Sequence, residues 1–496
     1  MEQRSNLMKL SQLLSTAKTT HQVIAGDVSC EIENIAIDSR LVKKGDIFFA
    51  LLGKTQDGSE FISDAINKGA VAVVTSQDHE ISGAVFIKTS DVFLLLVDCL
   101  KEFYSPLPAN IYAITGTNGK TSAAEFTRQI LQFLGKKSAS IGTLGTRCDA
   151  DIEAQLQSSS LTTPDIISLY KNLCILKKNG VDDVVLEVSS IGLEQGRIAG
   201  LKIDVGAFTN FTQDHLDYHK SMAEYFRCKM ILFSKSLPSG SVAVLNSDIP
   251  EFEDVRKTCE KKNHRIIDYG FKAKKLRLQK IEPHDLGQKV FFEFVGQNFE
   301  FELATSGDFQ AFNALCALGN ILAKNQISTK LLKEILQKFS KLQPAAGRMQ
   351  CAAILKNKAQ VFIDFAHSPD ALTNVLKLAR HLGKRVVVLF GCGGDRDATK
   401  RPIMGEIACR LADLVIVTDD NPRSENPATI RSEILAACDM KKTIEIDDRK
   451  LAIEKAIALL EPCDILILAG KGHEKYQIIG EKKFEFDEEK IVRAAS

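Results

Sequence analysis

The segment that most constrains the fold is residues 115–122, Thr-Gly-Thr-Asn-Gly-Lys-Thr-Ser, which directly follows an apolar run. A β-strand that ends in a glycine-rich turn and opens a helix aims backbone N–H groups and the positive end of the helix dipole at one point, which suits phosphate oxygens. Gly116 and Gly119 permit a close backbone approach, Lys120 reaches the terminal phosphates, and the Thr121 hydroxyl faces a magnesium ion. The segment therefore predicts a strand, a nucleotide-binding loop and a helix.

This loop departs in one place from the common nucleotide loop G-x-x-x-x-G-K-[S/T], because Ile114 stands where the first glycine would be. The competing interpretation is a strand-to-helix turn that is glycine-rich by chance. The placement of Gly-Lys-Thr favours nucleotide binding, but it does not specify a reaction.

Length and composition narrow the class of protein. With 496 residues the chain exceeds what one hydrophobic core usually supports, so we expect about three domains. Its 64 basic and 63 acidic residues leave a net charge of +1, which gives no general attraction to nucleic acid or to an anionic membrane. No apolar run approaches the roughly 18 residues that span a bilayer. The 12 cysteines contain no C-x-x-C pair, and we expect reduced thiols in a cytoplasmic monomer.

Two short breaks predict the domain boundaries. Residues 104–110 carry two prolines just before the nucleotide strand, and residues 342–348 contain a Pro/Gly break after a helical stretch. We therefore expect domains at residues 1–107, 108–343 and 344–496.

The two later domains alternate short β-branched runs with helical stretches, the pattern of a largely parallel sheet covered by helices. Polar clusters follow the predicted strands at residues 111–114, 183–188, 205–209, 361–365, 386–390, 414–418 and 465–469. Open α/β sheets bind ligands at the carboxyl ends of their strands. The clusters therefore predict two facing crevices and an active site between domains.

A series of short motifs carries a family resemblance. In order, they are Ile-Asp-Ser-Arg at 37–40, Gly-Asp-Ile-Phe at 45–48, the loop at 115–121, Leu-Glu-Val-Ser-Ser at 186–190, Asp-His-Leu-Asp-Tyr-His at 214–219, Gly-Arg-Met at 347–349, Ala-His-Ser-Pro-Asp-Ala-Leu at 366–372, Gly-Cys-Gly-Gly-Asp-Arg-Asp at 391–397, Asp-Asn-Pro-Arg at 420–423 and Gly-Lys-Gly-His-Glu at 470–474. With these motifs the chain resembles the Mur ligases, ATP-dependent amide-forming enzymes of peptidoglycan precursor synthesis. The resemblance implies an α/β protein of three domains: a small N-terminal UDP-binding domain, a central ATP-binding domain with a P-loop-type, mostly parallel sheet, and a C-terminal Rossmann-like domain that binds the amino acid.

The reaction that the resemblance implies is amide formation through an acyl phosphate. A substrate carboxylate attacks the γ-phosphate of ATP, and an incoming amine then displaces phosphate; this chemistry needs positioning and charge neutralisation. The ATP-binding residues that match the family are Gly116, Thr117, Asn118, Gly119, Lys120, Thr121, Ser122, Asn313, Arg348 and Asp364. For the last three, a helix cap or a structural polar residue is the competing interpretation.

The same resemblance assigns catalysis to Lys120, Glu187, His215 and Lys229, and it places Mg²⁺, with two ions expected, on Thr121, Glu187, His215 and Lys229. Hydroxyl and carboxylate oxygens suit magnesium, whereas a histidine ligand is unusual. Lys229 matches the lysine that carries a carbamate in the family, N6-carboxylysine, which is an anionic oxygen donor. The competing interpretations are a solvated loop acid for Glu187, a structural histidine for His215 and a snorkelling lysine for Lys229.

The acceptor substrate that the resemblance implies is UDP-MurNAc-L-Ala-D-Glu. The residues that align with its binding site are Ser39, Lys54, Thr55, Gln56, Thr162, Thr163, Ser189, Gln195 and Arg197. Hydroxyls and a guanidinium suit pyrophosphate and carboxylate groups. Leu161 and Ile191 stand where many relatives have Asn and His, so we expect one hydrogen bond to the sugar peptide to be missing.

The tetrapeptide at 420–423 is the sharpest specificity signal, since it is typical of family members that add meso-2,6-diaminopimelate, while L-lysine enzymes carry other residues at its end. A planar guanidinium can take the distal carboxylate by two parallel hydrogen bonds. The candidate residues are Arg396, Asp420, Asn421, Pro422, Arg423, Gly470 and Glu474. Outside this family, an ordinary Asn-Pro turn would be the favoured interpretation.

Three alternatives stay open at this point. A sibling that adds L-lysine is opposed by Arg423. An enzyme similar to folylpolyglutamate synthetase shares the loop and the two later domains, but the first 107 residues argue against it. A non-catalytic protein that binds a nucleotide sugar is opposed by the intact Lys120, Glu187, His215 and Lys229.

Overall fold

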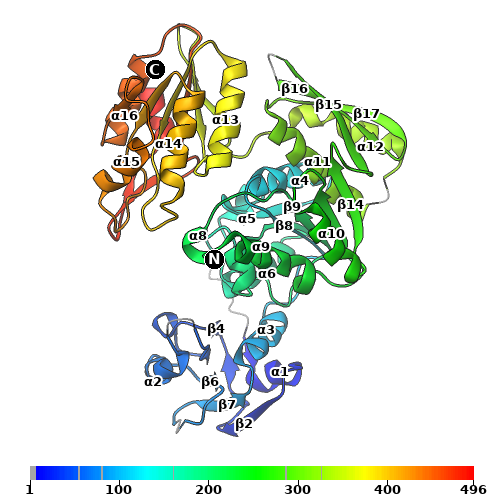
Figure 1. Ribbon diagram of the computed structural model, residues 1–496. Coiled ribbons are helices and arrows are strands. Elements are labelled where there is room, and N and C mark those ends of the chain that lie inside the picture. Colours follow the sequence, from blue (N-terminus) through cyan, green and yellow to red (C-terminus); the bar gives the residue numbers. More distant parts are fainter. Residues whose placement is uncertain (1–6, 54–55, 80–81, 160, 285–286, 326) are drawn as a thin grey trace. The chain divides into compact units, whose positions relative to one another are not determined.

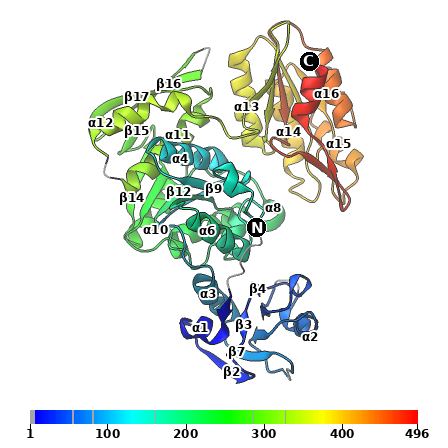
Figure 2. The same ribbon diagram turned by 180° about the vertical axis from the view of Figure 1, so that it is seen from behind.

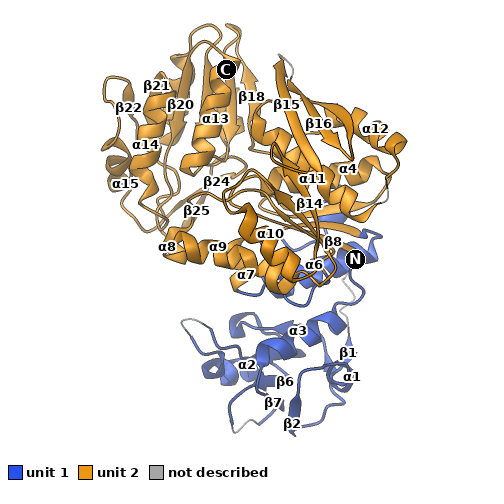
Figure 3. Ribbon diagram, turned by 45° about the vertical axis from the view of Figure 1, so that its right-hand side comes forward, with its two compact units in different colours: residues 1–109, 148–182, 195–202 blue, residues 110–147, 183–194, 203–496 orange. Residues whose placement is uncertain are grey.

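The protein is described by a computed structural model that covers residues 7–53, 56–79, 82–159, 161–284, 287–325 and 327–496. The chain forms two compact units (Figure 3). Unit 1 takes in residues 1–109, 148–182 and 195–202, and unit 2 takes in residues 110–147, 183–194 and 203–496. None of the helices in the described ranges combines the length and the hydropathy that crossing a membrane requires.

Unit 1 is built on a five-stranded sheet in the order β2 (His21–Ala25), β7 (Val85–Thr89), β6 (Ala72–Thr75), β5 (Asp46–Phe49) and β4 (Asn34–Ala36). Strands β4 to β7 are parallel, and β2 is antiparallel to β7. Its other elements are β1 (Met8–Lys9), α1 (Leu10–Ser15), β3 (Glu31–Ile32), α2 (Ile62–Asn67), α3 (Val92–Phe103), α5 (Ala150–Glu153) and α6 (Ile166–Lys178). Helix α3 begins where the Asp91 carboxylate accepts a hydrogen bond from Leu94 N, an N-cap that satisfies a donor of the first turn.

Unit 2 contains a ten-stranded sheet in the order β10 (Gly145–Arg147), β9 (Ser138–Gly142), β11 (Asp183–Glu187), β8 (Asn110–Thr115), β12 (Val205–Phe208), β13 (Val242–Asn246), β14 (Arg265–Gly270), β15 (Leu276–His284), β16 (Gly287–Phe294) and β17 (Gln297–Leu303). The strands from β9 to β15 run parallel, and the pairings of β10, β16 and β17 are antiparallel. Strands β9, β11, β12 and β13 are buried at every residue, as expected for parallel strands covered on both faces.

Two helices cover the centre of this sheet side by side, α4 (Lys120–Phe133) and α11 (Asp308–Lys324) (Figures 1 and 2). Their apolar residues share one core with Ile114 and Val244 of the sheet. The remaining helices around the sheet are α7 (Ser190–Glu194), α8 (Leu216–His219), α9 (Met222–Ile231), α10 (Phe252–Lys261) and α12 (Thr329–Gln337).

Strand β8 lies where the strand order changes direction. The chain leaves β8 through α4 to reach β9 on the β11 side, and after β11 it crosses to β12 on the other side of β8. Ligands of open α/β sheets bind outside the carboxyl end of the strands at such a point. The fold thus places the glycine-rich loop, which follows β8, at the expected ligand position.

The last part of unit 2 carries a six-stranded sheet in the order β18 (Gln350–Ile354), β19 (Gln360–Asp364), β23 (Ile465–Ala469), β20 (Val386–Phe390), β21 (Leu414–Val417) and β22 (Thr443–Glu445). Only the β18 edge pairs antiparallel. One core lies under α13 (Pro369–Leu382), α14 (Lys400–Leu411) and α15 (Pro427–Leu435), and a second lies under α16 (Arg449–Ala458) and α17 (Glu488–Ala495). A hairpin of β24 (Tyr476–Ile479) and β25 (Lys482–Glu485) completes it.

These sheets confirm the expected α/β class, with a small N-terminal sheet, a mostly parallel central sheet and a Rossmann-like C-terminal sheet. The expected domain bounds at residues 107 and 343 stay predictions.

Candidate active site

The phosphate loop lies between β8 and α4, as the sequence predicts. Gly116 has a φ of 143° and Gly119 a φ of 84°, a region that favours glycine. A Cβ atom on Gly116 would lie 1.9 Å from Thr209 Oγ1, and one on Gly119 would lie 2.4 Å from Asn313 Oδ1. Thr209 Oγ1 donates a hydrogen bond to the Asn118 carbonyl at 2.6 Å, which fixes the loop against the end of β12. Close approach therefore requires glycine at both positions.

Two lysines converge on one backbone carbonyl of this loop. Lys120 Nζ donates to Gly116 O at 2.9 Å and to Thr117 O at 2.8 Å, and Lys229 Nζ, from α9, donates to the same Gly116 O at 2.7 Å. Lys229 is 1% exposed, and its Nζ lies 4.2 Å from the Tyr225 ring centroid. Burial, and then the charge of Lys120, lower the pKa of Lys229 well below its ordinary value. The lowered pKa favours a neutral amine at this position.

Glu187, the last residue of β11, faces the same loop. Its carboxylate accepts hydrogen bonds from Thr121 Oγ1 at 2.8 Å and from Thr143 N at 2.9 Å. Burial raises the pKa of Glu187, while the charge of Lys120 opposes that rise. The hydroxyl and the carboxylate form a pair of hard oxygen donors of the kind that magnesium prefers.

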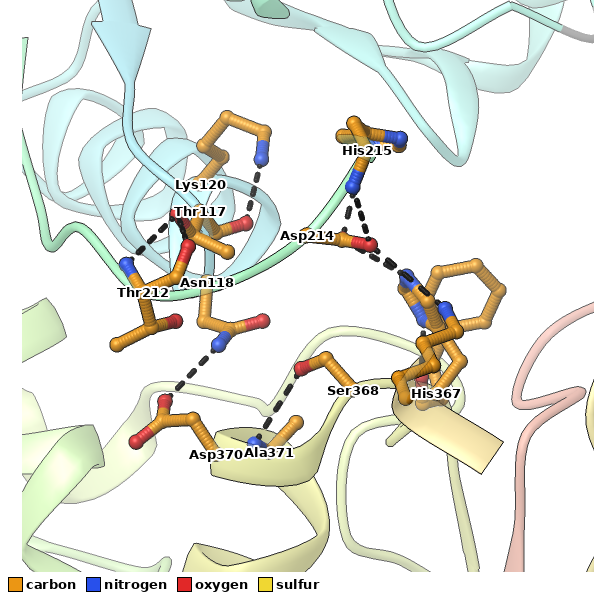
Figure 4. Close-up of polar contacts among 12 residues, drawn as sticks. Thr117, Asn118, Lys120, Thr212, Asp214, His215, His367, Ser368, Asp370 and Ala371 are labelled. Carbon is orange, nitrogen blue, oxygen red and sulfur yellow. Dashed lines mark hydrogen bonds and ion pairs between the residues drawn. The ribbon is translucent and has the colours of Figure 1, made fainter. Parts of the chain in front are cut away.

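A buried carboxylate, Asp214, lies beside three basic side chains, and Figure 4 shows two of them, His215 and His367. Its Oδ2 lies 3.6 Å from His215 Nε2 and 3.5 Å from His367 Nε2, and its Oδ1 lies 3.6 Å from Lys400 Nζ. Burial alone would raise the pKa of Asp214, but these neighbours hold it well below its ordinary value. Burial lowers the pKa of His215 to about 4, so its ring is neutral at pH 7 and has a nitrogen that can bind a metal.

A cavity of about 330 Å³ opens beside the loop. Its apolar part includes three aromatic residues, namely Tyr269, Phe309 and Phe312. Flat apolar walls with a few polar groups suit a nucleobase. Most of the predicted ATP-binding residues line it: Asn118, Gly119, Thr121, Ser122 and Asn313, together with Arg348 and Asp364 from the C-terminal sheet region. The cavity therefore joins the phosphate loop to a space of the right character for a nucleoside.

Two side chains, those of Arg348 and His473, pack against the Phe365 ring beside this cavity. The Arg348 guanidinium carbon lies 4.6 Å from the ring centroid, and the His473 ring lies 5.3 Å from it. Arg348 Nη2 also donates to Thr121 Oγ1 at 3.4 Å. Burial, and then the charge of Arg348, lower the pKa of His473 to about 4.

The predicted amino-acid residues lie together after β21 and β23. Asn421 Oδ1 accepts from Lys471 Nζ at 2.9 Å, and its Nδ2 donates to Glu474 Oε2 at 2.8 Å. Arg423 has a φ of 54°, and its Nη1 donates to Gly394 O at 2.7 Å. Among the described residues, no ion pair involves Arg423. The cluster thus offers a guanidinium to a carboxylate and a glutamate to an ammonium group.

The other predicted members of this cluster differ in burial. Asp420 and Pro422 are buried, and a Cβ on Gly470 would lie 2.5 Å from Asp420 Oδ2. Arg396 is exposed, and its Nη1 donates to the carbonyl of Asp395 at 2.9 Å.

The predicted sugar-nucleotide residues are divided between the units. In unit 1, Arg197 donates to Thr163 O at 2.7 Å and to Gln195 Oε1 at 2.7 Å. In unit 2, Ser189 Oγ accepts from Gly192 N at 3.0 Å. Of the rest, Ser39 is buried, Thr162 is half-buried and Gln56 is exposed, while Lys54 and Thr55 lie outside the described residues. Their role stays a prediction.

The structure adds site residues that had no predicted role. Lys400 begins α14 after the loop that follows β20, and Lys471 lies in the motif at residues 470–474, so their position could have drawn attention to them. Tyr269, Phe309 and Phe312 carry no such signal, because aromatic residues in an α/β sequence are expected in the core.

Comparisons with known proteins cover most of the chain. Three family models match: "Mur ligase family, catalytic domain" at residues 31–95, "Mur ligase middle domain" at 114–321 and "Mur ligase, glutamate ligase domain" at 347–472. A UDP-N-acetylmuramoyl-L-alanyl-D-glutamate--2,6-diaminopimelate ligase of Mesorhizobium japonicum is 42% identical over 95% of this chain and 96% of its own length. The enzyme of the same name from Rhizobium meliloti is 41% identical over 98% and 99%. A solved structure of a ligase of this name matches with a TM-score of 0.68, 29% identity and 98% coverage of both chains.

We expect Gly116→Ala to abolish detectable ATP binding in calorimetry, because the added Cβ would displace Thr209 and with it the loop. Overpacking of this kind costs about 1–3 kcal/mol of stability. Gly135→Ala is the matched control, since Gly135 also has a positive φ, 76°, but a Cβ there meets nothing within 4 Å. Wild-type ATP affinity in Gly116→Ala would contradict the packing argument.

The depressed pKa of His473 predicts a pH dependence of stability. Because the folded pKa of about 4 lies below the ordinary 6.5, the unfolded chain binds a proton first as the pH falls. The neutral His473 ring therefore makes its full contribution to the free energy of unfolding above pH 6.5. This contribution is lost as the pH falls toward 4, and the loss is at most about 3 kcal/mol. Thermal unfolding between pH 7 and 4 should show a shallower loss in His473→Gln than in the wild type. An equal loss of thermal stability with falling pH in both proteins would show that His473 does not cause that loss.

Proposed function

Because this chain belongs to the Mur ligase family, we propose that it is the ATP-dependent ligase that joins 2,6-diaminopimelate to UDP-N-acetylmuramoyl-L-alanyl-D-glutamate in peptidoglycan biosynthesis. The observation that carries the proposal is Arg423, a guanidinium without an ion pair among the described residues, in a chain that aligns with ligases of this name over nearly its full length. The meso stereoisomer is the form that we propose.

The nucleotide half of the reaction follows from the loop and the cavity. We place the adenine between the aromatic side chains and the triphosphate along residues 116–122. Lys120 then leaves the carbonyls of Gly116 and Thr117 and donates to the terminal phosphates, whose charge is a better acceptor than a neutral carbonyl. Arg348 lies beside Thr121 and adds a second cation. These groups hold the γ-phosphate in position for attack by the substrate carboxylate.

The residues present fit magnesium, since Thr121 and Glu187 already meet at 2.8 Å through oxygen atoms and Glu187 is 3% exposed. We propose that Thr121, Glu187, His215 and a carbamate on Lys229 hold it, with two ions expected. Magnesium when bound would neutralise charge on the phosphates.

A carbamate on Lys229 is chemically consistent with its surroundings. The lowered pKa provides the neutral amine that CO₂ requires: the amine nitrogen forms a bond to the CO₂ carbon, and one proton leaves to solvent. The product is an anion in place of a neutral amine, next to Lys120. It therefore attracts the Lys120 ammonium group and adds an oxygen donor.

On the acceptor side, we propose that Ser39, Lys54, Thr55 and Gln56 contact the uridine diphosphate. Thr162, Thr163, Ser189, Gln195 and Arg197 would then contact the muramoyl dipeptide, whose free carboxylate is the group to be activated. Arginine and hydroxyl donors suit these anionic groups. The exposed side chain of Leu161 offers no hydrogen bond to the sugar peptide.

The amine specificity rests on the cluster after β21. We propose that Arg423 binds the distal carboxylate of diaminopimelate, with Arg396 as a second cation, and that Glu474 takes the distal ammonium. Asp420, Asn421, Pro422 and Gly470 shape the pocket. L-Lysine lacks the distal carboxylate, so it would leave the half-buried guanidinium without that partner, which lowers kcat/KM for L-lysine relative to diaminopimelate.

One assay tests the function. Purified chain receives ATP, magnesium, UDP-N-acetylmuramoyl-L-alanyl-D-glutamate and one amine at a time, while phosphate release and product mass are followed. We expect product with diaminopimelate. Turnover with L-lysine alone would overturn the specificity, and phosphate release only with a folate and glutamate would overturn the whole assignment.

We expect Arg423→Leu to lower kcat/KM for diaminopimelate by at least about a hundredfold, because a lost charged hydrogen bond costs roughly 3 kcal/mol. The KM for ATP should stay within about twofold, as the nucleotide cavity is lined by other residues. Arg410→Leu, an exposed arginine of α14, is the control and should behave as the wild type. Equal losses in both variants would contradict the role of Arg423.

For Lys229, we expect Lys229→Ala to lose activity and to regain part of it with added acetate or formate, which supply the missing carboxylate oxygens. Lys235→Ala removes an exposed lysine a short distance along the same segment and should change nothing. An inactive Lys229→Ala that binds ATP normally but is not rescued would argue against the carbamate.

A further inference from the structure

Three potential metal ligands meet on the side of α9 that the proposed reaction does not use. They are Glu194 at the end of α7, His219 at the end of α8 and Cys228 in the middle of α9, and one ligand atom from each lies within 4.8 Å of the other two. Helices α7 and α9 are neighbours (Figure 3). A thiol, an imidazole and a carboxylate from three separate segments therefore face one point inside unit 2.

The histidine of this group is already oriented. His219 is 1% exposed, and its Nε2 lies 2.8 Å from Ser190 Oγ. Its Nδ1 is buried and has no hydrogen-bond partner among the residues that the structure describes. A histidine that binds a metal through one ring nitrogen usually makes a hydrogen bond with the other, which fixes the tautomer and the ring direction. The bond to Ser190 provides that support and leaves Nδ1 as the ligand atom.

From these contacts we propose that Glu194, His219 and Cys228 form a binding site for a soft divalent cation, zinc in the first place, distinct from the magnesium ligands. Sulfur and nitrogen donors select zinc over magnesium, which prefers oxygen ligands. In a tetrahedral zinc site the ligand atoms are roughly 3.5 Å apart, so the three side chains need to approach one another by about 1 Å. Water would fill the fourth position.

The aromatic ring of Tyr225 lies between this proposed zinc site and Lys229. The His219 ring packs against Tyr225 at a centroid distance of 5.2 Å, and Lys229 Nζ lies 4.2 Å from the same tyrosine ring. A cation at this point would join α7, α8 and α9, and α9 is the helix that presents Lys229 to Gly116. The cation therefore holds these three helices together next to the phosphate loop. This structural role does not depend on which amine the enzyme uses.

Cobalt titration of the full-length, chelator-treated protein tests the site, because cobalt occupies zinc sites and its bond to a thiolate gives a charge-transfer absorption. Excess magnesium and no nucleotide are present, so that the oxygen ligands at Glu187 are occupied by magnesium. We expect one equivalent of cobalt to produce the thiolate band, zinc to displace it, and zinc to raise the thermal midpoint until a chelator is added. Absence of the thiolate band in the wild type would overturn the proposal.

Matched variants identify the ligands. Cys228→Ser should remove the band, whereas Cys259→Ser, which changes another buried thiol of unit 2, should keep it. Ser190→Ala leaves all three ligands in place and should weaken cobalt binding by about 10–100-fold, the usual effect of losing a partner of a ligating histidine. A band that persists in Cys228→Ser would place the metal elsewhere. If Cys228→Ser does not fold, Glu194→Gln takes its place, and unchanged cobalt affinity in that variant overturns the site.

Discussion

The active site depends on positive charge that is buried beside one backbone carbonyl. Lys120 and Lys229 both donate to Gly116 O, and Lys229 makes no ion pair with any described acid. Two ammonium groups that share one acceptor repel each other, and the repulsion falls when one of them loses its proton, as the lowered pKa of Lys229 indicates. The loop is therefore electrostatically incomplete without an anion. A triphosphate and a carbamate are the two anions that would complete it.

The acidic side chain of Asp214, near the loop, is surrounded by basic side chains. Asp214 is buried, and its carboxylate lies 3.6 Å from the Lys400 ammonium group and faces the rings of His215 and His367. The Lys400 charge reduces the repulsion between Asp214 and an incoming triphosphate. Two of these three partners come from the chain beyond residue 347. The charge around the nucleotide loop thus depends also on side chains from the C-terminal part of the chain, one in the loop after β19 and one at the start of α14.

The sequence predicts those parts of the site that are local. Gly116 and Lys120 lie in the loop and at the helix start after β8, and Glu187 ends β11, so a short motif and the topology of a parallel sheet fix their place. It does not predict that Lys229 reaches Gly116 O, since this contact requires α9 to pack against the loop after β8. Nor does it identify Phe309 as a cavity residue, because an aromatic side chain in a core and one in a nucleobase pocket follow the same pattern.

The backbone conformation at Arg423 helps to distinguish a functional role of its side chain from a structural one. Its φ of 54° is unfavourable for any residue with a Cβ, at a cost of about 1–2 kcal/mol that glycine would avoid. Its N–H donates to Ile478 O at 3.1 Å, a bond that any residue except proline could make. The backbone thus gives no reason for an arginine here, and its Nη1 contacts with Gly394 O and, at 3.5 Å, with Asn421 O use at most two of five donors. The strain is explained if the remaining donors serve a carboxylate of the substrate.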